Sequence, residues 1–185
     1  KSEWFEKFRW FFTSDKRLVI GGRDATTNEI IIKKHTEQND IVFHTDMSGS
    51  PFFVLKDGEN ADMAVFKEAA DATCSFSKAW QLGLGRQSVF FVSPEQVTKT
   101  PKSGEYLTKG AFIIKGKTNY IDNKINLAVG MLNDKRLMCA PVESVKANCE
   151  KLLLIEQGQG KTSEAAKAIR KEFNYHDLDY IIRIL

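Results

Sequence analysis

A lysine-rich tract from residue 99 to residue 124 carries the clearest chemistry in the sequence. Six lysines stand there against only two acids, Glu105 and Asp122, and three glycines interrupt the tract. Flexible ammonium groups neutralise backbone phosphates without reading sequence, and glycines let a polyanion approach the main chain. Tyr106 adds an aromatic ring. The tract therefore predicts a nucleic-acid contact, with an ordinary solvated surface as the alternative. The lysines assigned to this contact are Lys99, Lys109, Lys115 and Lys117.

Arg23 is a second candidate for contact with nucleic acid. It follows two glycines and precedes Asp24. A guanidinium presents a planar fork of donors that fits a phosphate or the edge of a base. We therefore place Arg23 with the lysines, and Asp24 with the groups that shape the site.

His44 and Asp46 stand two residues apart on an expected strand. Side chains at this spacing point to the same face, so a metal site or an acid–base pair is conceivable. The other two histidines, His35 and His176, show no spacing that completes a metal site. We therefore expect no metal, and interpret His44 and Asp46 as hydrogen-bonding groups that order the neighbouring loop, which contains Ser50.

The segment from Gly158 to Thr162 resembles part of a nucleotide-binding loop. Such a loop needs a glycine five residues before its Gly-Lys pair, and Ile155 stands at that position. A turn that leads into a helix explains the segment, and we expect no nucleotide cofactor.

Composition excludes several classes of protein. The 185 residues suffice for one domain with a hydrophobic core, and 42% are hydrophobic. No apolar run approaches the roughly 20 residues of a membrane helix, and no leader peptide is apparent. Three cysteines without close pairing argue against disulfides and zinc, so a reducing cytoplasm is expected. A net charge of +3 is too small to indicate nucleic acid by itself.

The pattern of apolar residues predicts an α+β fold with a largely antiparallel or mixed sheet covered by helices. Short loops between adjacent strands favour this over strict alternation of strands and helices. Helices are expected over residues 3–12, 61–82, 162–173 and 177–185, with a shorter one starting at Pro141. Strands are expected over residues 17–22, 28–35, 40–46, 52–56, 88–92, 111–117, 127–132, 136–140 and 151–156, the first two of them forming a hairpin.

Four segments taken together resemble the NFACT-R domain, an RNA-binding module of the NFACT proteins. They are residues 22–29 (Gly-Arg-Asp-Ala, then Asn-Glu), residues 44–50 (His-Thr-Asp-Met-Ser-Gly-Ser), residues 77–80 (Ser-Lys-Ala-Trp) and residues 96–120. They span roughly residues 4 to 121, and the remainder resembles an extension found in archaeal members. We therefore expect one NFACT-R-like domain over residues 1–185. Its core family region would be 1–121, and residues 122–185 would add strands and two helices.

The resemblance implies a role on the large ribosomal subunit during rescue of stalled translation, with tRNA or ribosomal RNA as the partner. We assign RNA contact to Arg23, Lys99, Lys109, Lys115, Lys117 and Tyr106. The groups expected to shape the site are Asp24, Asn28, His44, Asp46, Ser50 and Glu105. Double-stranded RNA would be recognised mainly by its shape and backbone. Two alternatives stay open: an RNA-modifying enzyme or enzyme subunit with Asp24, His44, Asp46 and Glu105 in one cleft, and a domain that docks on a ribosomal protein.

Overall fold

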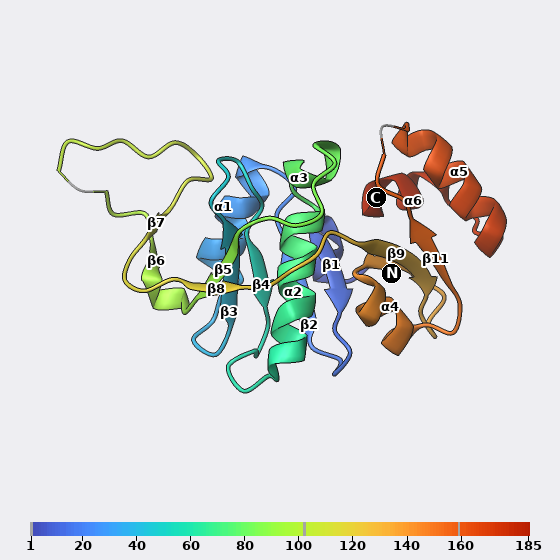
Figure 1. Ribbon diagram of the computed structural model, residues 1–185, viewed down its shortest axis with the longest axis horizontal. Coiled ribbons are helices and arrows are strands. Elements are labelled where there is room, and N and C mark those ends of the chain that lie inside the picture. The colour runs from blue at the N-terminus through green and yellow to red at the C-terminus, as the bar shows by residue number, and fades with distance from the viewer. Residues whose placement is uncertain (1, 102, 159) are drawn as a thin grey trace.

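The computed structural model describes residues 2–101, 103–158 and 160–185. It confirms the predicted α+β class, because every paired strand is antiparallel and helices pack against the sheets (Figure 1). The main sheet has six strands in the order β1-β2-β4-β3-β5-β8. Their bounds are Arg9–Phe12 (β1), Leu18–Gly21 (β2), Ile41–Thr45 (β3), Phe53–Leu55 (β4), Val89–Val92 (β5) and Asn119–Ile121 (β8).

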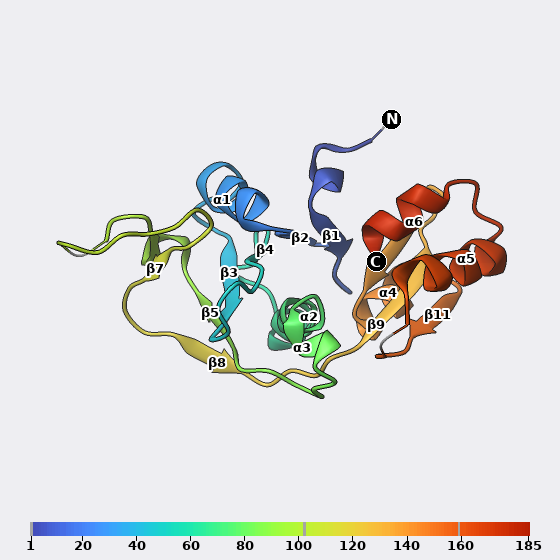
Figure 2. The same cartoon turned by 90° about the horizontal axis from the view of Figure 1, so that it is seen from above.

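Helices cover both faces of the main sheet. Helices α1 (Ala25–Lys34) and α2 (Met63–Ser75) lie on opposite sides of the central strands (Figure 2). The inner face of α2 is rich in alanine, and Ala69 and Ala72 are fully buried. Because alanine is short, α2 packs closely on the sheet, where Phe43 meets Phe66 edge to face. A four-residue helix, α3 (Lys78–Gln81), follows α2.

The C-terminal third forms a second, smaller sheet beside strand β1 (Figure 1). Its order is β10-β9-β11. The two layers share apolar contacts, because Met138 and Val145 belong to the same buried cluster as Phe11 and Val19. The bounds are Leu127–Met131 (β9), Leu137–Ala140 (β10), Val142–Asn148 (α4), Leu152–Ile155 (β11), Thr162–Phe173 (α5) and Leu178–Ile184 (α6). These elements match the strands and helices predicted for this part of the chain.

A long loop projects from the edge of the main sheet. It joins the two short strands β6 (Val97–Thr98) and β7 (Ile113–Ile114), which pair with each other after the short helix η2 (Pro94–Gln96). We call residues 99–101 and 103–112 the arm, and Figure 1 shows these two stretches extending away from the body of the protein. The strand predicted over residues 111–117 is thus reduced to two residues.

The helix predicted over residues 3–12 is wrong. The segment forms a single turn, η1 (Trp4–Lys7), followed by strand β1. Trp10 pairs with Ile20 in the register of β1 and β2, and both are buried. Aromatic residues favour strands when a partner strand is available, and a partner strand is information that helical spacing alone does not contain.

The strand predicted over residues 28–35 is also wrong, because this segment is helix α1. Asp24 caps it: its carboxylate accepts a 2.8 Å bond from the amide of Thr27. The Thr27 hydroxyl lies 3.0 Å from the Asp24 amide in return. This reciprocal cap satisfies backbone groups that a helix start leaves free, and it offsets the strand preference of three consecutive isoleucines. The loop interpreted as a hairpin turn is therefore the start of a helix.

The helix predicted over residues 61–82 divides into α2 and α3. Phe76 ends the first helix, and the Ser77 hydroxyl accepts a 3.2 Å bond from the amide of Ala79 to begin the second. Across the three described ranges, no helix is both long and apolar enough to cross a bilayer.

Candidate nucleic-acid interface

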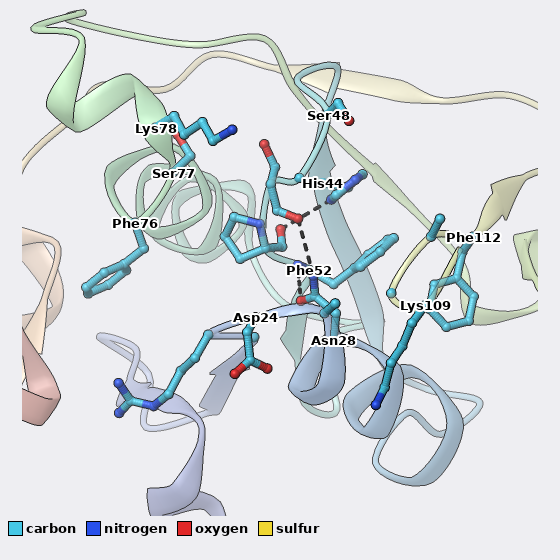
Figure 3. Close-up of a pocket in the computed structure, with 18 of the residues that line it drawn as sticks. Asp24, Asn28, His44, Ser48, Phe52, Phe76, Ser77, Lys78, Lys109 and Phe112 are labelled. Carbon is cyan, nitrogen blue, oxygen red and sulfur yellow. Dashed lines mark hydrogen bonds between the residues drawn. The ribbon is translucent and has the colours of Figure 1, made fainter. Parts of the chain in front are cut away.

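A cavity of about 460 Å³ opens at one end of the main sheet, and all four segments that prompted the family resemblance contribute to its wall. The start of α1, the loop after β3, the start of α3 and the end of the arm surround it (Figure 3). It lies within the roughly 300–1,000 Å³ range of small-ligand sites. Of the residues proposed from the sequence, six line it: Arg23, Asp24, Asn28, His44, Ser50 and Lys109.

Asn28 holds the floor of the cavity together. It is 6% exposed, and its Oδ1 accepts a 3.0 Å bond from the amide of Phe52 while its Nδ2 donates to the carbonyl of Ser50 at 3.4 Å. Gly22 lies so close that a Cβ there would fall 1.8 Å from Asn28 Oδ1. The glycine is therefore required by this close approach, and Asn28 fixes the floor of the cavity.

The imidazole ring of His44 is neutral and is held in one orientation by Pro51 and Phe52. Its Nδ1 lies 3.2 Å from the carbonyl oxygen of Pro51, and its ring stacks on Phe52 with a centroid distance of 3.9 Å. A carbonyl can only accept, so Nδ1 carries the proton and Nε2 keeps a free lone pair. Burial lowers the pKa of His44, which outweighs the opposing effects of the Pro51 carbonyl and Asp46. Nε2 therefore acts as a hydrogen-bond acceptor near neutral pH.

The charges around the cavity are mainly positive. Four basic residues line it against one carboxylate, that of Asp24. Asp24 is occupied by capping α1, and the backbone bond from Thr27 is the main cause of its lowered pKa. Lys78 and Lys109 are exposed and come from opposite sides of the cavity; Lys78 is directed toward it, whereas the ammonium group of Lys109 points along α1 (Figure 3). The basic residues are Arg9, Arg23, Lys78 and Lys109.

Arg23 has a structural role as well as a place in the lining. Its Nη1 donates to the carbonyl of Arg183 at 2.6 Å, and its other two nitrogens donate to the carbonyls of Lys7 and Phe8 at 3.3 Å. Its pKa is lowered to about 10, mainly by burial and in addition by the charges of Arg9 and Arg183. The guanidinium of Arg23, which was expected to bind phosphate, thus mainly joins α6 to the residues before β1.

The lysines of the arm and of the segment that follows strand β7 divide into two kinds. The ammonium of Lys99 lies 3.0 Å from the carboxylate of Glu29, donates to the carbonyl of Thr108 and sits 4.6 Å from the centre of the Phe112 ring. The charge of Lys99 is therefore already neutralised by Glu29, which argues against the RNA contact assigned to this lysine from the sequence. Within the described part of the chain, no carboxylate pairs with three other lysines, and their side chains are exposed: Lys109, Lys115 and Lys117.

The remaining predicted residues lie outside the cavity wall. Tyr106 is 87% exposed on the arm, beside the exposed Glu105. Asp46 accepts bonds of 2.9 and 3.1 Å from the hydroxyl of Tyr120, which sequence reasoning did not anticipate. Asp46 and Glu105 therefore do not join His44 in the cleft that the enzyme hypothesis requires. Among the described residues, no group of three metal-ligating side chains is close enough to hold an ion.

Three residues that matter to the site were missed. Lys78 could have been found, because it belongs to the Ser77–Trp80 segment and follows a helix cap. Phe112 and Glu29 also lay inside family segments, but nothing in the sequence pairs them with Lys99. Glu29 accepts a 2.8 Å bond from the amide of Gly110 and also pairs with Lys33. Its contacts depend on the folding of the arm onto α1.

Comparison with known proteins agrees with the motifs. The sequence model of the family described as "NFACT protein RNA binding domain" matches residues 7–116. The archaeal Rqc2 homolog aRqcH of Methanocaldococcus jannaschii is 41% identical over 191 residues, which cover 99% of this chain and 28% of that protein. The human ribosome quality control complex subunit NEMF is 42% identical over 123 residues, covering 65% of this chain and 11% of that protein. The chain thus spans less than a third of the length of these relatives.

A solved structure shares the fold. The C-terminal part of the fibronectin/fibrinogen-binding protein from Streptococcus suis superposes with a TM-score of 0.55 at 16% identity, covering 77% of this chain and 49% of that one. The family match over residues 7–116 includes every residue that lines the cavity. From the matched family model and the archaeal relative, we conclude that this chain belongs to the NFACT protein RNA binding domain family.

Proposed function

We propose that this domain binds RNA through the cavity and the adjoining arm, and that it serves a ribosome quality control factor acting on stalled large subunits. The observation that supports this most strongly is the arrangement of Lys78, Lys109, Lys115 and Lys117. Lys78 and Lys109 line the cavity, and Lys115 and Lys117 follow the arm in the sequence. All four side chains are exposed, and no described carboxylate pairs with them. Such a surface fits an anionic polymer.

The proposed setting rests on the relatives. Proteins named as ribosome quality control complex subunits in human and in Schizosaccharomyces pombe align with most of this chain, the latter over 96% of it. Transfer RNA and large-subunit ribosomal RNA are therefore the partners to test first.

The test compares two double substitutions that change net charge equally. Lys115→Glu with Lys117→Glu alters the proposed surface. Lys146→Glu with Lys167→Glu is the matched control, because these exposed lysines take part only in weak pairs of 3.8 and 3.6 Å on α4 and α5. Affinity for tRNA and for large-subunit rRNA fragments is measured from 50 to 200 mM salt.

The first pair should lose about tenfold or more in affinity. The slope of log K against log salt concentration should become shallower by about 1.4 to 1.8 units, since roughly 0.7–0.9 counterion is released per phosphate contact and two contacts are lost. The control pair should stay within about twofold of wild type. Equal losses in both pairs would show that RNA senses only net charge, and would contradict the assigned surface.

A further inference from the structure

We infer that the cavity receives one unpaired nucleotide of the bound RNA. In this arrangement a phosphate lies between Lys78 and Lys109, and a hydrogen-bond donor of the base or ribose meets Nε2 of His44. This inference rests on the proposed RNA binding and makes it specific, because it names the structural class of RNA that is recognised.

The size of the cavity favours a single nucleotide over a duplex. Its volume of about 460 Å³ is that of a site for one small ligand, and it is closed on several sides by the start of α1, the loop containing Ser48 and the end of the arm. A paired base in an A-form helix cannot enter such a hollow. Proteins that read RNA bases generally take them from loops, bulges and ends, where they are already unstacked.

The charges fix where a phosphate would lie. Lys78 and Lys109 line the cavity on opposite sides (Figure 3), and Asp24 is the one carboxylate among the residues of its wall. Because Asp24 is committed to Thr27, its charge is partly offset by the bonds that it accepts. An anionic group at the mouth of the cavity would therefore be stabilised, because both lysine side chains are exposed and can turn toward it.

The neutral imidazole of His44 fixes which part of the nucleotide lies deeper. Nδ1–H is directed to Pro51, so Nε2 can only accept a hydrogen bond. A phosphate oxygen is itself an acceptor and gains nothing there. Amino and imino groups of bases and the 2′-hydroxyl of ribose are donors, and they complement Nε2.

The apolar part of the wall suits the faces of a base. Pro51, Phe52 and Phe112 line the cavity, and Phe52 meets Phe112 edge to face at 5.5 Å. Aromatic side chains bind unstacked bases through their ring faces in single-strand binding proteins. His44 covers one face of the buried Phe52 ring, so Phe112 is the aromatic ring offered to a base. A nucleotide matches this cavity better than an inorganic anion does. It can use the lysines at the mouth, the apolar side chains of the wall and the acceptor Nε2 of His44.

The experiment uses two RNA probes and two tryptophan variants. The probes are a blunt 16-base-pair RNA duplex and the same duplex with a single bulged 2-aminopurine nucleotide. Ser48→Trp places bulk at the mouth of the cavity from an exposed position, and Ser163→Trp is the control on the exposed surface of α5. Affinity is measured by fluorescence anisotropy, and the environment of the bulged base by its own emission.

Wild-type protein and Ser163→Trp should bind the bulged duplex at least about fivefold more tightly than the blunt one, with a change in 2-aminopurine emission. Ser48→Trp should bind both duplexes equally and leave the emission unchanged. Equal wild-type affinities for the two probes, each still falling with salt, would overturn the nucleotide pocket and leave the proposed function standing. A bulge preference that persists in Ser48→Trp would also overturn it, since the base would then be held elsewhere. Failure to bind any RNA would overturn the proposed function itself.

Discussion

The carboxylate of Glu29 accepts a 2.8 Å hydrogen bond from the backbone amide of Gly110, which joins helix α1 to the end of the arm. Lys99 completes the junction through its ion pair with the same carboxylate. Since residues 108–112 form one wall of the cavity, this junction sets the position of that wall relative to α1. The four predictions that follow test how such contacts support the site.

The Glu29 junction should make stability depend on pH in the acid range. Burial alone would raise the pKa of Glu29, but its bonds from Lys33, Gly110 and Lys99 prevail and lower it to about 2, from an ordinary 4.5. In the unfolded chain the carboxylate takes up a proton near its ordinary pKa, while the folded chain resists protonation to about pH 2. The contribution is therefore complete above about pH 4.5 and is lost as pH falls toward 2.

Glu29→Gln removes this titration. The difference in Tm between wild type and Glu29→Gln should be largest above pH 5 and should shrink steadily between pH 4.5 and 2.5, followed by circular dichroism. A difference that is constant over this range would show that the charge of Glu29 does not hold the arm.

Gly110→Ala should loosen the arm far more than Gly104→Ala. Both glycines have positive φ, +81° and +86°, so both variants incur the roughly 1–2 kcal/mol cost of a left-handed residue with a side chain. Only at Gly110 would the new Cβ fall 2.8 Å from Cα of Ala25; at Gly104 nothing lies within 4 Å. We expect arm amides to exchange hydrogen at least tenfold faster in Gly110→Ala than in Gly104→Ala. Similar exchange in the two variants would mean that the junction is not closely packed.

Arg23→Lys separates a structural role from an RNA contact. The substitution keeps the charge but loses the planar fork that donates to the carbonyls of Lys7, Phe8 and Arg183. We expect a loss of about 1–3 kcal/mol in the free energy of unfolding, with less than threefold change in RNA affinity below the transition. A tenfold loss of affinity at unchanged stability would instead identify Arg23 as an RNA ligand.

We propose that residues 1–185 form one domain, and Glu68 provides the test. Its buried carboxylate accepts bonds from the amide and hydroxyl of Ser14 at 2.8 and 2.5 Å and from the hydroxyl of Ser144 at 2.7 Å. It thereby links α2, the β1–β2 turn and α4. Glu68→Gln should lower the Tm of a single calorimetric transition by several degrees, because each lost charge-assisted bond is worth about 1.5–3 kcal/mol. Two separate transitions would show that residues 122–185 unfold on their own.

Six of the residues assigned from the sequence line one cavity, whereas two of the elements that carry its lining residues were predicted wrongly. His44, Ser50 and Lys109 were assigned from motifs and charge, and all three line one cavity. The helix expected over residues 3–12 and the strand expected over residues 28–35 were both wrong. Aromatic and β-branched residues suit either a buried strand or a buried helix face, and the choice depends on neighbours distant in sequence.

The dependence on distant neighbours also explains why the partners of two basic residues, Lys99 and Arg23, were not predicted. Lys99 and Lys109 are equivalent in sequence, ten residues apart in one basic tract, yet Lys99 is paired with Glu29 and Lys109 is exposed. In the sequence, Arg23 looks like an unpaired guanidinium. In the structure it donates to backbone carbonyls, among them that of Arg183, 160 residues later in the sequence. Charge and spacing do not reveal which ions a folded chain pairs internally.

By itself, the sequence determined the α+β class, the family and six of the residues that line the cavity, because composition, periodicity and motif are local properties. The tertiary structure alone decided that Lys78, His44, Phe52 and Phe112 meet around one hollow, and that Nε2 of His44 remains available as an acceptor. These relations join segments up to some seventy residues apart, and their geometry arises only when the sheet and its covering helices have packed.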